Sequence, residues 1–437
     1  MDTQSEVAKR TIRKLTTRII PYIFILYIIS FLDRVNIGYA ALTMNKALSL
    51  SSSVFGLISG IFFIGYFIFE VPSNIILHKI GARIWIARIM VTWGIVVIIT
   101  AWAANATHLY ILRFLLGLAE AGFFPGIILY LTLWFPAKQQ ARAIALFMSA
   151  MPVSNIIGAP ISAWFLGFTH LGWEGWRWLF VWEGLPAVIF GIITIFYLTD
   201  RPEQAKWLSD EEKNWLTTKL KEEHEAKIAA KKLTTKEALA NRRVWYLSLV
   251  YFFSQNGLFG VGFWLPTIIK GFSNSLSNQQ VGFIAMIPYI VAGVSMIFVA
   301  RHSDRTGERR IHTAIPPLVG AIGLIGSGMS HDPVVQIIML SIATAGIFSY
   351  YACFWSMTST FLTGAAAAVG IAVINSIGNL GGFVGPYTIG LLKDATGSVY
   401  TGLYYLGGCL LITSLLILAL RKENPSSASS QSGKQAV

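Results

Sequence analysis

The chain has few charged residues and almost no cysteine. Asp, Glu, Lys and Arg together make up 13% of its residues, about half the share found in a typical soluble domain. Its two cysteines, Cys353 and Cys409, both lie inside apolar runs. Neither a disulfide framework nor a cysteine zinc site can be built from them, so both are expected to be buried, unreactive thiols.

Sequence signatures of catalysis are also missing. The chain contains no phosphate-binding G-x-x-x-x-G-K-[ST] loop and no H-E-x-x-H zinc motif. No stretch outside the apolar runs is long enough for a separate catalytic domain. These absences argue against an enzyme and against ATP-driven pumping, and no metal or organic cofactor is expected.

What the chain has instead is apolar length. Hydrophobic residues make up 54% of it and the mean hydropathy is +0.61. Runs of about 20 apolar residues, long enough to cross a bilayer as helices, occur at 19–43, 54–77, 84–104, 109–133, 143–167, 176–199, 244–269, 281–301, 312–330, 334–358, 362–391 and 399–420. The sequence predicts an all-α integral membrane protein with twelve transmembrane helices in two six-helix bundles, since a β-barrel would show short alternating segments.

The predicted organisation has five parts. They are a cytoplasmic N-terminal segment (1–18), a first bundle (19–199), a polar linker (200–242), a second bundle (243–420) and a disordered tail (421–437). In the linker, Ser209 and Glu212 form a capping box that opens a short helix with an apolar face. That helix is expected either to lie along the membrane surface or to be a solvated connector.

The formal net charge of +13 reflects topology, not nucleic-acid binding. Basic residues crowd before the first run, in every second connection and after the last run, whereas the other connections hold few. The positive-inside rule therefore places both termini in the cytoplasm. The first run is too long for a signal peptide, contains Asp33 and lacks a small-residue cleavage site, so it should remain attached.

Ionisable residues inside the apolar runs are the strongest sign of function. Asp33 and Arg34 lie in the first run, and Arg113 and Glu120 lie in the fourth. A charge at the centre of a membrane helix costs about 3 kcal/mol on insertion scales, so it must face partners or a water-filled cavity. At about 1.5 Å per residue, both acids lie near the bilayer midplane, and Arg113 shares a helix face with Glu120 two turns away.

The two halves carry a similar turn at matching positions. The second connection has Lys79, Gly81 and Arg83, and the eighth has a fuller version containing Asp304, Arg305, Gly307 and Arg309. Glycine allows the tight reversal, and the charges can pair across the bundles. We expect these residues to latch the cytoplasmic side in one conformation.

This turn resembles the loop signature of the major facilitator superfamily. Four longer motifs are similar to those of its anion:cation symporter family. They are Leu32-Asp33-Arg34-Val35-Asn36-Ile37-Gly38, Phe69-Glu70-Val71-Pro72-Ser73-Asn74, Arg113 through Glu120 with Ala121-Gly122-Phe123-Phe124-Pro125-Gly126, and Gly175-Trp176-Arg177-Trp178-Leu179-Phe180. The resemblance covers about residues 10–422. It departs at His78, where the superfamily signature usually has Asp, so the latch in the first half lacks that acid.

The resemblance implies a function. Bacterial members import organic acids such as tartrate, sugar acids, hydroxyphenylacetate or phthalate across the inner membrane, usually with protons. By resemblance, Arg34, Tyr66 and Asn379 are substrate contacts, and Asp33 and Glu120 are proton sites. The implied partners are a small carboxylate anion, protons and lipid, with the monomer as the functional unit and the proton as the coupling ion.

The residues support the same interpretation by themselves. A guanidinium can hold either a protein carboxylate or a substrate carboxylate in a bidentate fork. Protonating Asp33 or Glu120 would free Arg34 or Arg113 for the substrate, which makes proton and anion binding depend on each other. The structural alternative is an ion-pair network that only holds the two helices in register.

Other polar residues inside the runs are secondary candidates for contacting the solute: Tyr66, Asn155, Asn256, Ser356, Asn375 and Asn379. Interhelical hydrogen bonding is the alternative for each of them. Glu70 is expected to be interfacial or part of the latch. Phe31, Met151 and Phe354 are expected to be apolar cavity residues, and the sequence does not choose between hydroxylated diacids, sugar acids and aromatic acids.

Two other functions remain open. A polytopic receptor could bind an anion and signal without moving it. An exporter of drugs or metabolites with the same fold would be expected to present acids without paired arginines. Flux under an imposed pH gradient separates the receptor from a proton-coupled importer.

Overall fold

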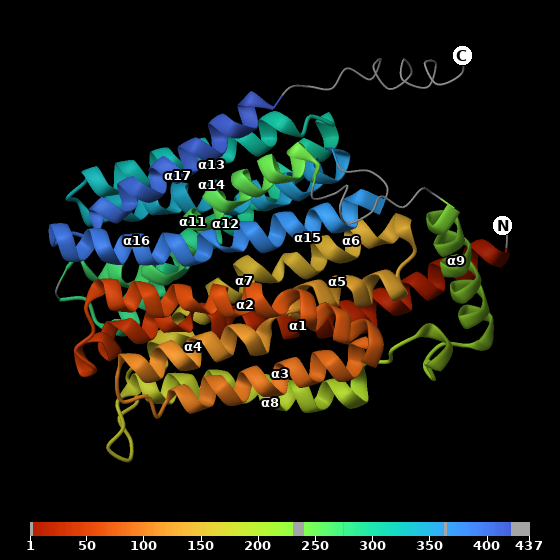
Figure 1. Ribbon diagram of the computed structural model, residues 1–437, viewed down its shortest axis with the longest axis horizontal. Coiled ribbons are helices and arrows are strands. Elements are labelled where there is room, and N and C mark those ends of the chain that lie inside the picture. Colours follow the sequence, from red (N-terminus) through yellow and green to blue (C-terminus); the bar gives the residue numbers. More distant parts are fainter. Residues whose placement is uncertain (1–2, 230–239, 274, 362–364, 421–437) are drawn as a thin grey trace.

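The structure is a computed structural model that describes residues 3–229, 240–273, 275–361 and 365–420. These residues form helices without strands, arranged as two bundles that lie side by side (Figure 1). The first bundle contains α1 (Thr3–Ala47), α2 (Ser52–Ile80), α3 (Ala82–Thr100), α4 (Ala106–Glu120), α5 (Phe123–Trp134), α6 (Ala137–Met148), α7 (Ala150–Phe165) and α8 (Gly175–Tyr197).

The second bundle follows a connection that holds the short helix η1 (Pro202–Gln204) and α9 (Asp210–Ala229). It contains α11 (Arg242–Lys270), α12 (Asn278–Thr306), α13 (Arg310–Met329), α14 (Pro333–Phe361), α15 (Ala365–Asn379), α16 (Gly381–Thr396) and α17 (Tyr400–Ala419). Within the described residues, each of the twelve predicted apolar runs falls on one of these helices or on a consecutive pair. The first three residues of the run 362–391, and the predicted tail 421–437, lie outside the described residues.

Ten helices or consecutive pairs are long and apolar enough to cross a membrane. The other two spans are α11 and the pair α15 and α16. The polar run Ser254-Gln255-Asn256 lowers the hydropathy in the middle of α11, and α15 and α16 are each too short alone. Large apolar side chains such as Phe196, 83% exposed, and Phe298, 67% exposed, cover the outer surface, as expected for residues that face lipid.

Three predicted spans are interrupted. The fourth divides into α4 and α5 because Gly122 adopts a left-handed backbone with φ +90°. A Cβ atom there would lie 2.2 Å from the hydroxyl of Ser73, and that hydroxyl donates a hydrogen bond of 2.6 Å to the carbonyl of Ala121. The sequence pattern gives only apolar length, so it does not reveal such a break.

The two ends of the bundles differ in how they meet. We call the end where α1 begins and α17 ends the terminal side, and the opposite end the far side (Figure 1). On the far side, Asp394 of α16 accepts hydrogen bonds from the amides of Ser52 and Ser53, at 3.0 and 2.7 Å. The glycines Gly56, Gly60 and Gly390 let α2 and α16 approach until their backbones touch. The far side is therefore tightly closed.

Deeper in the interface, α2 and α15 are joined by a second set of hydrogen bonds. Glu70 accepts from Asn375 at 2.9 Å and from Ser376 at 2.6 Å. Glu70 is 4% exposed. Glu70, which the sequence placed near the cytoplasmic end of its span as an interfacial or latch residue, is buried between the two bundles on the terminal side of their midplane.

The linker helix α9 docks on the terminal side of the first bundle (Figure 1). Its predicted capping box forms, with Ser209 and Glu212 bonded reciprocally at 2.9 and 3.3 Å. Glu212 is fully buried and pairs with Arg10 and Lys14 of α1, both at 2.8 Å. Leu216 is buried too. One face of this helix is therefore packed against protein, and Glu212 joins it to α1.

Candidate functional site

A cavity lies between the two bundles near their middle. Its volume, counted as the space open to the centres of water molecules, is about 40 Å³, enough for a few waters. The first bundle contributes Tyr27, Phe31, Arg34, Tyr66, Phe124, Met148 and Met151 to the wall, and the second contributes Tyr251, Gln255, Leu258, Phe259, Tyr351, Trp355, Asn375 and Asn379. Arg34 is the charged group among these lining residues.

Arg34 on α1 forms an ion pair with Glu120 on α4. The Arg34 side chain is 12% exposed, whereas Glu120 is 1% exposed. The same oxygen of Glu120 accepts a hydrogen bond from Ser30 at 2.9 Å, and its second oxygen has no hydrogen-bond partner among the described residues. The pair therefore has one member at the cavity wall and one behind it.

The guanidinium of Arg34 also lies over two aromatic rings. Its carbon is 5.3 Å from the ring centre of Phe62 and 5.7 Å from that of Tyr66. Such contacts stabilise a cation without occupying its N–H donors. Arg34 can thus exchange its carboxylate partner and keep these aromatic contacts.

Arg113 is buried behind the wall. It is 1% exposed, donates a hydrogen bond of 3.3 Å to the carbonyl of Arg34 and lies over the rings of Phe62 and Phe263. No acid among the described residues is within ion-pair distance of it. The sequence predicted Arg113 as a substrate contact. The structure places it next to Arg34 but outside the set of residues that line the cavity.

Asp33 is buried on the other side of α1. It is 1% exposed and accepts a hydrogen bond of 2.8 Å from the indole of Trp93 on α3, while its other oxygen is unpaired among the described residues. Arg113 and Glu120 are within electrostatic range of it. The four predicted charged residues thus form one cluster, and of the four Arg34 is the one that lines the cavity.

Neutral polar groups face Arg34 from the second bundle. Tyr351 donates its hydroxyl to Gln255, and the amide of Gln255 donates to Asn379 at 2.7 Å. All three line the cavity. A ligand between the bundles would therefore meet a cation on one side and a chain of amides and a hydroxyl on the other.

The remaining predicted contacts divide into two groups. Tyr66 and Asn375 line this cavity, and Asn155 lines a smaller neighbouring one together with Phe31. Asn256 is buried in hydrogen bonds with Tyr405 and with the carbonyl of Phe252. Ser356 follows the lining residue Trp355 on α14 but is not among the lining residues.

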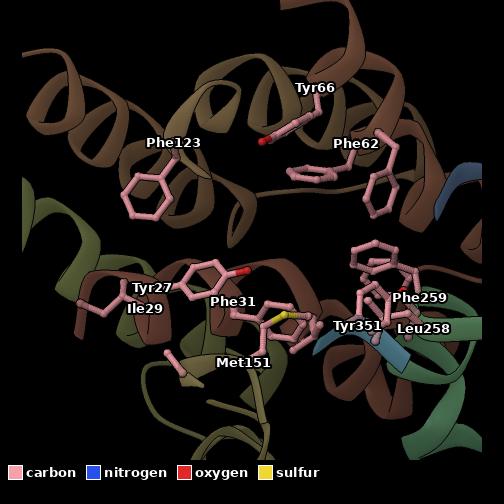
Figure 2. Packing of buried hydrophobic residues seen from close by; sticks show 14 of the residues in the cluster. Tyr27, Ile29, Phe31, Phe62, Tyr66, Phe123, Met151, Leu258, Phe259 and Tyr351 are labelled. Carbon is pink, nitrogen blue, oxygen red and sulfur yellow. The ribbon is translucent and has the colours of Figure 1, made fainter. Parts of the chain in front are cut away.

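Aromatic and thioether groups make up most of the cavity wall. In Figure 2, Tyr27 and Tyr66 extend toward the same space from opposite sides, and Met151, Leu258 and Phe259 lie nearby. Of the predicted apolar residues, Phe31 and Met151 line the cavity, but Phe354 stacks behind Tyr251 with ring centres 5.2 Å apart.

The predicted latch residues pair within each bundle. Arg83 contacts Asp200 at the end of α8, at 3.4 Å, and Arg309 contacts Asp304 in its own turn, at 2.6 Å. Gly81 and Gly307 provide the positive φ angles of the two turns, +103° and +69°. Lys79 and Arg305 lie in the last turns of α2 and α12, and neither forms an ion pair with a residue that the structure describes. Pairing between bundles remains a prediction for another conformation.

Three functional candidates were missed from the sequence. Gln255 lies halfway along α11 and Tyr351 lies inside α14. A polar side chain that deep in an apolar run could have been recognised in the sequence as a candidate contact. Glu183 is a buried acid on α8. Like Asp33, it is an ionisable residue inside an apolar run, so the same reasoning could have identified it. Within the described ranges, no three His, Cys, Asp or Glu residues are grouped so that they could hold a metal ion.

Comparison with known proteins identifies relatives along nearly the whole chain. The sequence profile of the Major Facilitator Superfamily matches residues 23–386. A protein of Agrobacterium vitis named "Putative tartrate transporter" is 51% identical over 432 residues, covering 99% of this chain and 96% of its own length. A "Quinolone resistance transporter" of Acinetobacter baumannii is 40% identical, with 93% and 94% of the two chains covered.

Solved structures support the fold. A D-xylose–proton symporter superposes with a TM-score of 0.74 at 16% identity, covering 93% of this chain and 98% of its own. A bacterial homologue of the lysosomal transporter Spinster, in an inward-facing conformation, gives 0.70 at 16% identity, covering 91% and 94%. The predicted fold of twelve helices in two bundles is confirmed.

Proposed function

The chain belongs to the major facilitator superfamily and is a multi-pass membrane transporter, and from that premise we propose that it imports a small organic carboxylate together with protons. The anion binds between the two bundles at Arg34. The terminal side faces the cytoplasm and the far side faces the periplasm of a bacterial inner membrane, as the distribution of basic residues predicts.

The observation that carries this proposal is the ion pair between Arg34 and Glu120 at the cavity wall. Removing one partner of a buried pair costs about 3–5 kcal/mol, because the other charge stays buried and uncompensated. Protonation of Glu120 therefore favours binding of a substrate carboxylate to Arg34. Deprotonation of Glu120 favours release of the substrate.

The second bundle would recognise the rest of the substrate. Asn379, Gln255 and Tyr351 present amide and hydroxyl groups to the cavity, and these suit the hydroxyl groups of a hydroxy acid. Relatives named as tartrate transporters at 51% and 52% identity support this substrate class. A substrate that touches both bundles would also link its binding to their rocking motion.

The conformation of the structure fits release toward the terminal side. The far side is sealed by contacts between α2 and α16, whereas Glu70 and its two partners are the contact that would separate for release.

Uptake into proteoliposomes tests this function. With a pH gradient, acid outside, we expect labelled tartrate or a related hydroxy acid to accumulate and the external medium to become more alkaline. A protonophore should abolish the accumulation. Binding without flux would instead identify a receptor, and uptake insensitive to the pH gradient would exclude proton coupling.

Export is the second candidate function, because a quinolone resistance transporter is 40% identical. Quinolones also carry a carboxylate, so Arg34 could serve either direction. Inverted vesicles that accumulate a quinolone under a pH gradient, with no uptake of hydroxy acids in right-side-out vesicles, would favour the exporter.

A further inference from the structure

A second group of buried polar side chains lies inside the first bundle, away from the cavity. Glu183 of α8 is 6% exposed and accepts a hydrogen bond of 2.5 Å from Ser162 of α7. Its other oxygen, Oε2, has no hydrogen-bond partner among the described residues, and no described base is within ion-pair distance. An acid in this position is costly in a membrane helix, so it usually marks a functional site.

Asn36 of α1 lies between this acid and the charged cluster. It is 1% exposed, its side chain is close to that of Glu183, and both of its polar atoms lack a well-formed hydrogen bond to any described residue. Asn36 is one helical turn from Asp33, whose Oδ1 is also unpaired. Buried polar atoms of this kind usually hold an ordered water.

These residues are ordered by depth. Ser162 is three residues from the end of α7, about 5 Å from the far side at 1.5 Å per residue. Glu183 is eight residues into α8, about 12 Å deep, and Asn36 and Asp33 are about 16 and 21 Å from the end of α1. The group therefore leads from the far side toward Asp33.

The surroundings of Glu183 leave it few ionisable neighbours. The elements packed against α8 are α1, α3 and α7. Helix α1 offers Asp33 and Tyr39, both near Glu183, and α7 has no titratable residue. The arginines of α3, Arg83 and Arg88, lie in its first two turns at the terminal side.

We propose that Glu183 is a third proton-binding carboxylate, which passes protons between the far side and Asp33 through a water held by Asn36. A proton from far-side water binds Oε2 and converts the carboxylate to the acid. The acid then gives that proton, through the bridging water, to Oδ1 of Asp33. Glu183 returns to the carboxylate and Asp33 becomes the acid, so one proton moves inward by one step.

This inference rests on the proposed proton-coupled function, and the glutamine variant tests it. Glu183→Gln keeps the size and can still accept from Ser162, but cannot carry a proton. We expect exchange of internal for external substrate, which needs no net proton movement, to stay within twofold of wild type. Uphill uptake should fall at least fivefold, and its rise with external acidity should flatten.

Companion variants separate a proton role from a structural one. Glu183→Asp keeps an acid and should restore the pH profile, and Ser162→Ala keeps the acid but removes its hydrogen bond and should leave the profile intact. Asn36→Ala should flatten the profile as Glu183→Gln does, which gives a second test if the glutamine variant does not fold.

The outcomes are distinct. An unchanged pH profile in Glu183→Gln or in Asn36→Ala overturns the relay, as does an equal loss of exchange and uptake in a folded, substrate-binding Glu183→Gln protein. If wild type itself shows no uptake driven by a pH gradient, the proposed function fails, and the relay fails with it.

Discussion

The two bundles share one architecture but differ sharply in what they bury. The first bundle buries Asp33, Glu70, Arg113, Glu120 and Glu183, whereas the buried polar residues described in the second bundle are neutral hydroxyls and amides. Burying charge in a membrane protein is costly, so a buried charge usually marks a functional site. The difference indicates that proton coupling resides in the first bundle and that the second recognises the uncharged part of the substrate.

The strongest way to break this comparison is to remove the cation at the cavity. Arg34→Ala should lower the ratio kcat/KM for uptake by about 100-fold or more, since losing one partner of a buried charge pair costs about 3 kcal/mol. Arg34→Lys keeps the charge but loses the bidentate fork. Its kcat/KM should therefore lie between those of wild type and Arg34→Ala. Near-normal uptake by Arg34→Ala would remove Arg34 from the site.

Asp33→Asn separates binding from coupling. Because Asp33 is buried and does not line the cavity, we expect substrate affinity and substrate exchange to remain within about threefold of wild type. Accumulation driven by a pH gradient should be lost. Measurements of exchange and uphill uptake on one preparation test this, with Asp33→Glu as the matched control, and full accumulation by Asp33→Asn would contradict the assignment.

Changes in the second bundle should have a smaller effect of a different kind. Asn379→Ala removes an amide that lines the cavity, and a neutral hydrogen bond from such a group to the substrate contributes about 1 kcal/mol. We expect KM to rise about fivefold, while the number of protons moved per substrate does not change. A change in that ratio would show that the second bundle also takes part in coupling.

The smallest effect concerns the linker helix that docks on the first bundle. Burial acts to raise the pKa of Glu212, but hydrogen bonds from Lys14 and from the Ser209 amide outweigh it and lower the pKa from 4.5 to about 2. A depressed carboxyl pKa stabilises the folded state above the unfolded value, and this contribution is lost as the pH falls from 4.5 to about 2.

Thermal unfolding of Glu212→Gln measures that contribution. Because Arg10 and Lys14 are about half exposed, solvent screening limits the expected destabilisation to about 1 kcal/mol at neutral pH. The difference from wild type should vanish near pH 2. A difference that persists there would mean that Glu212 acts by packing and not by charge.

The sequence predicted the helices and their two bundles because a transmembrane helix is recognisable as an apolar run of about 20 residues. It also identified Asp33, Arg34, Arg113 and Glu120, since a charge in an apolar run is conspicuous. It did not reveal the break at Gly122, which depends on a contact with Ser73, nor that Arg113 lies behind the wall. Which side of a helix meets a partner is decided by packing between segments far apart in the chain, so Gln255 and Tyr351 were not singled out.

The central claim is that Glu120 and the substrate compete for Arg34. Calorimetry of substrate binding in buffers of different ionisation enthalpy measures how many protons are taken up with each substrate molecule. The account predicts that wild type takes up protons when substrate binds near neutral pH. Glu120→Gln should take up none at this site, and its substrate affinity should not require a low pH. Equal proton uptake by both proteins, or none by wild type, would contradict it.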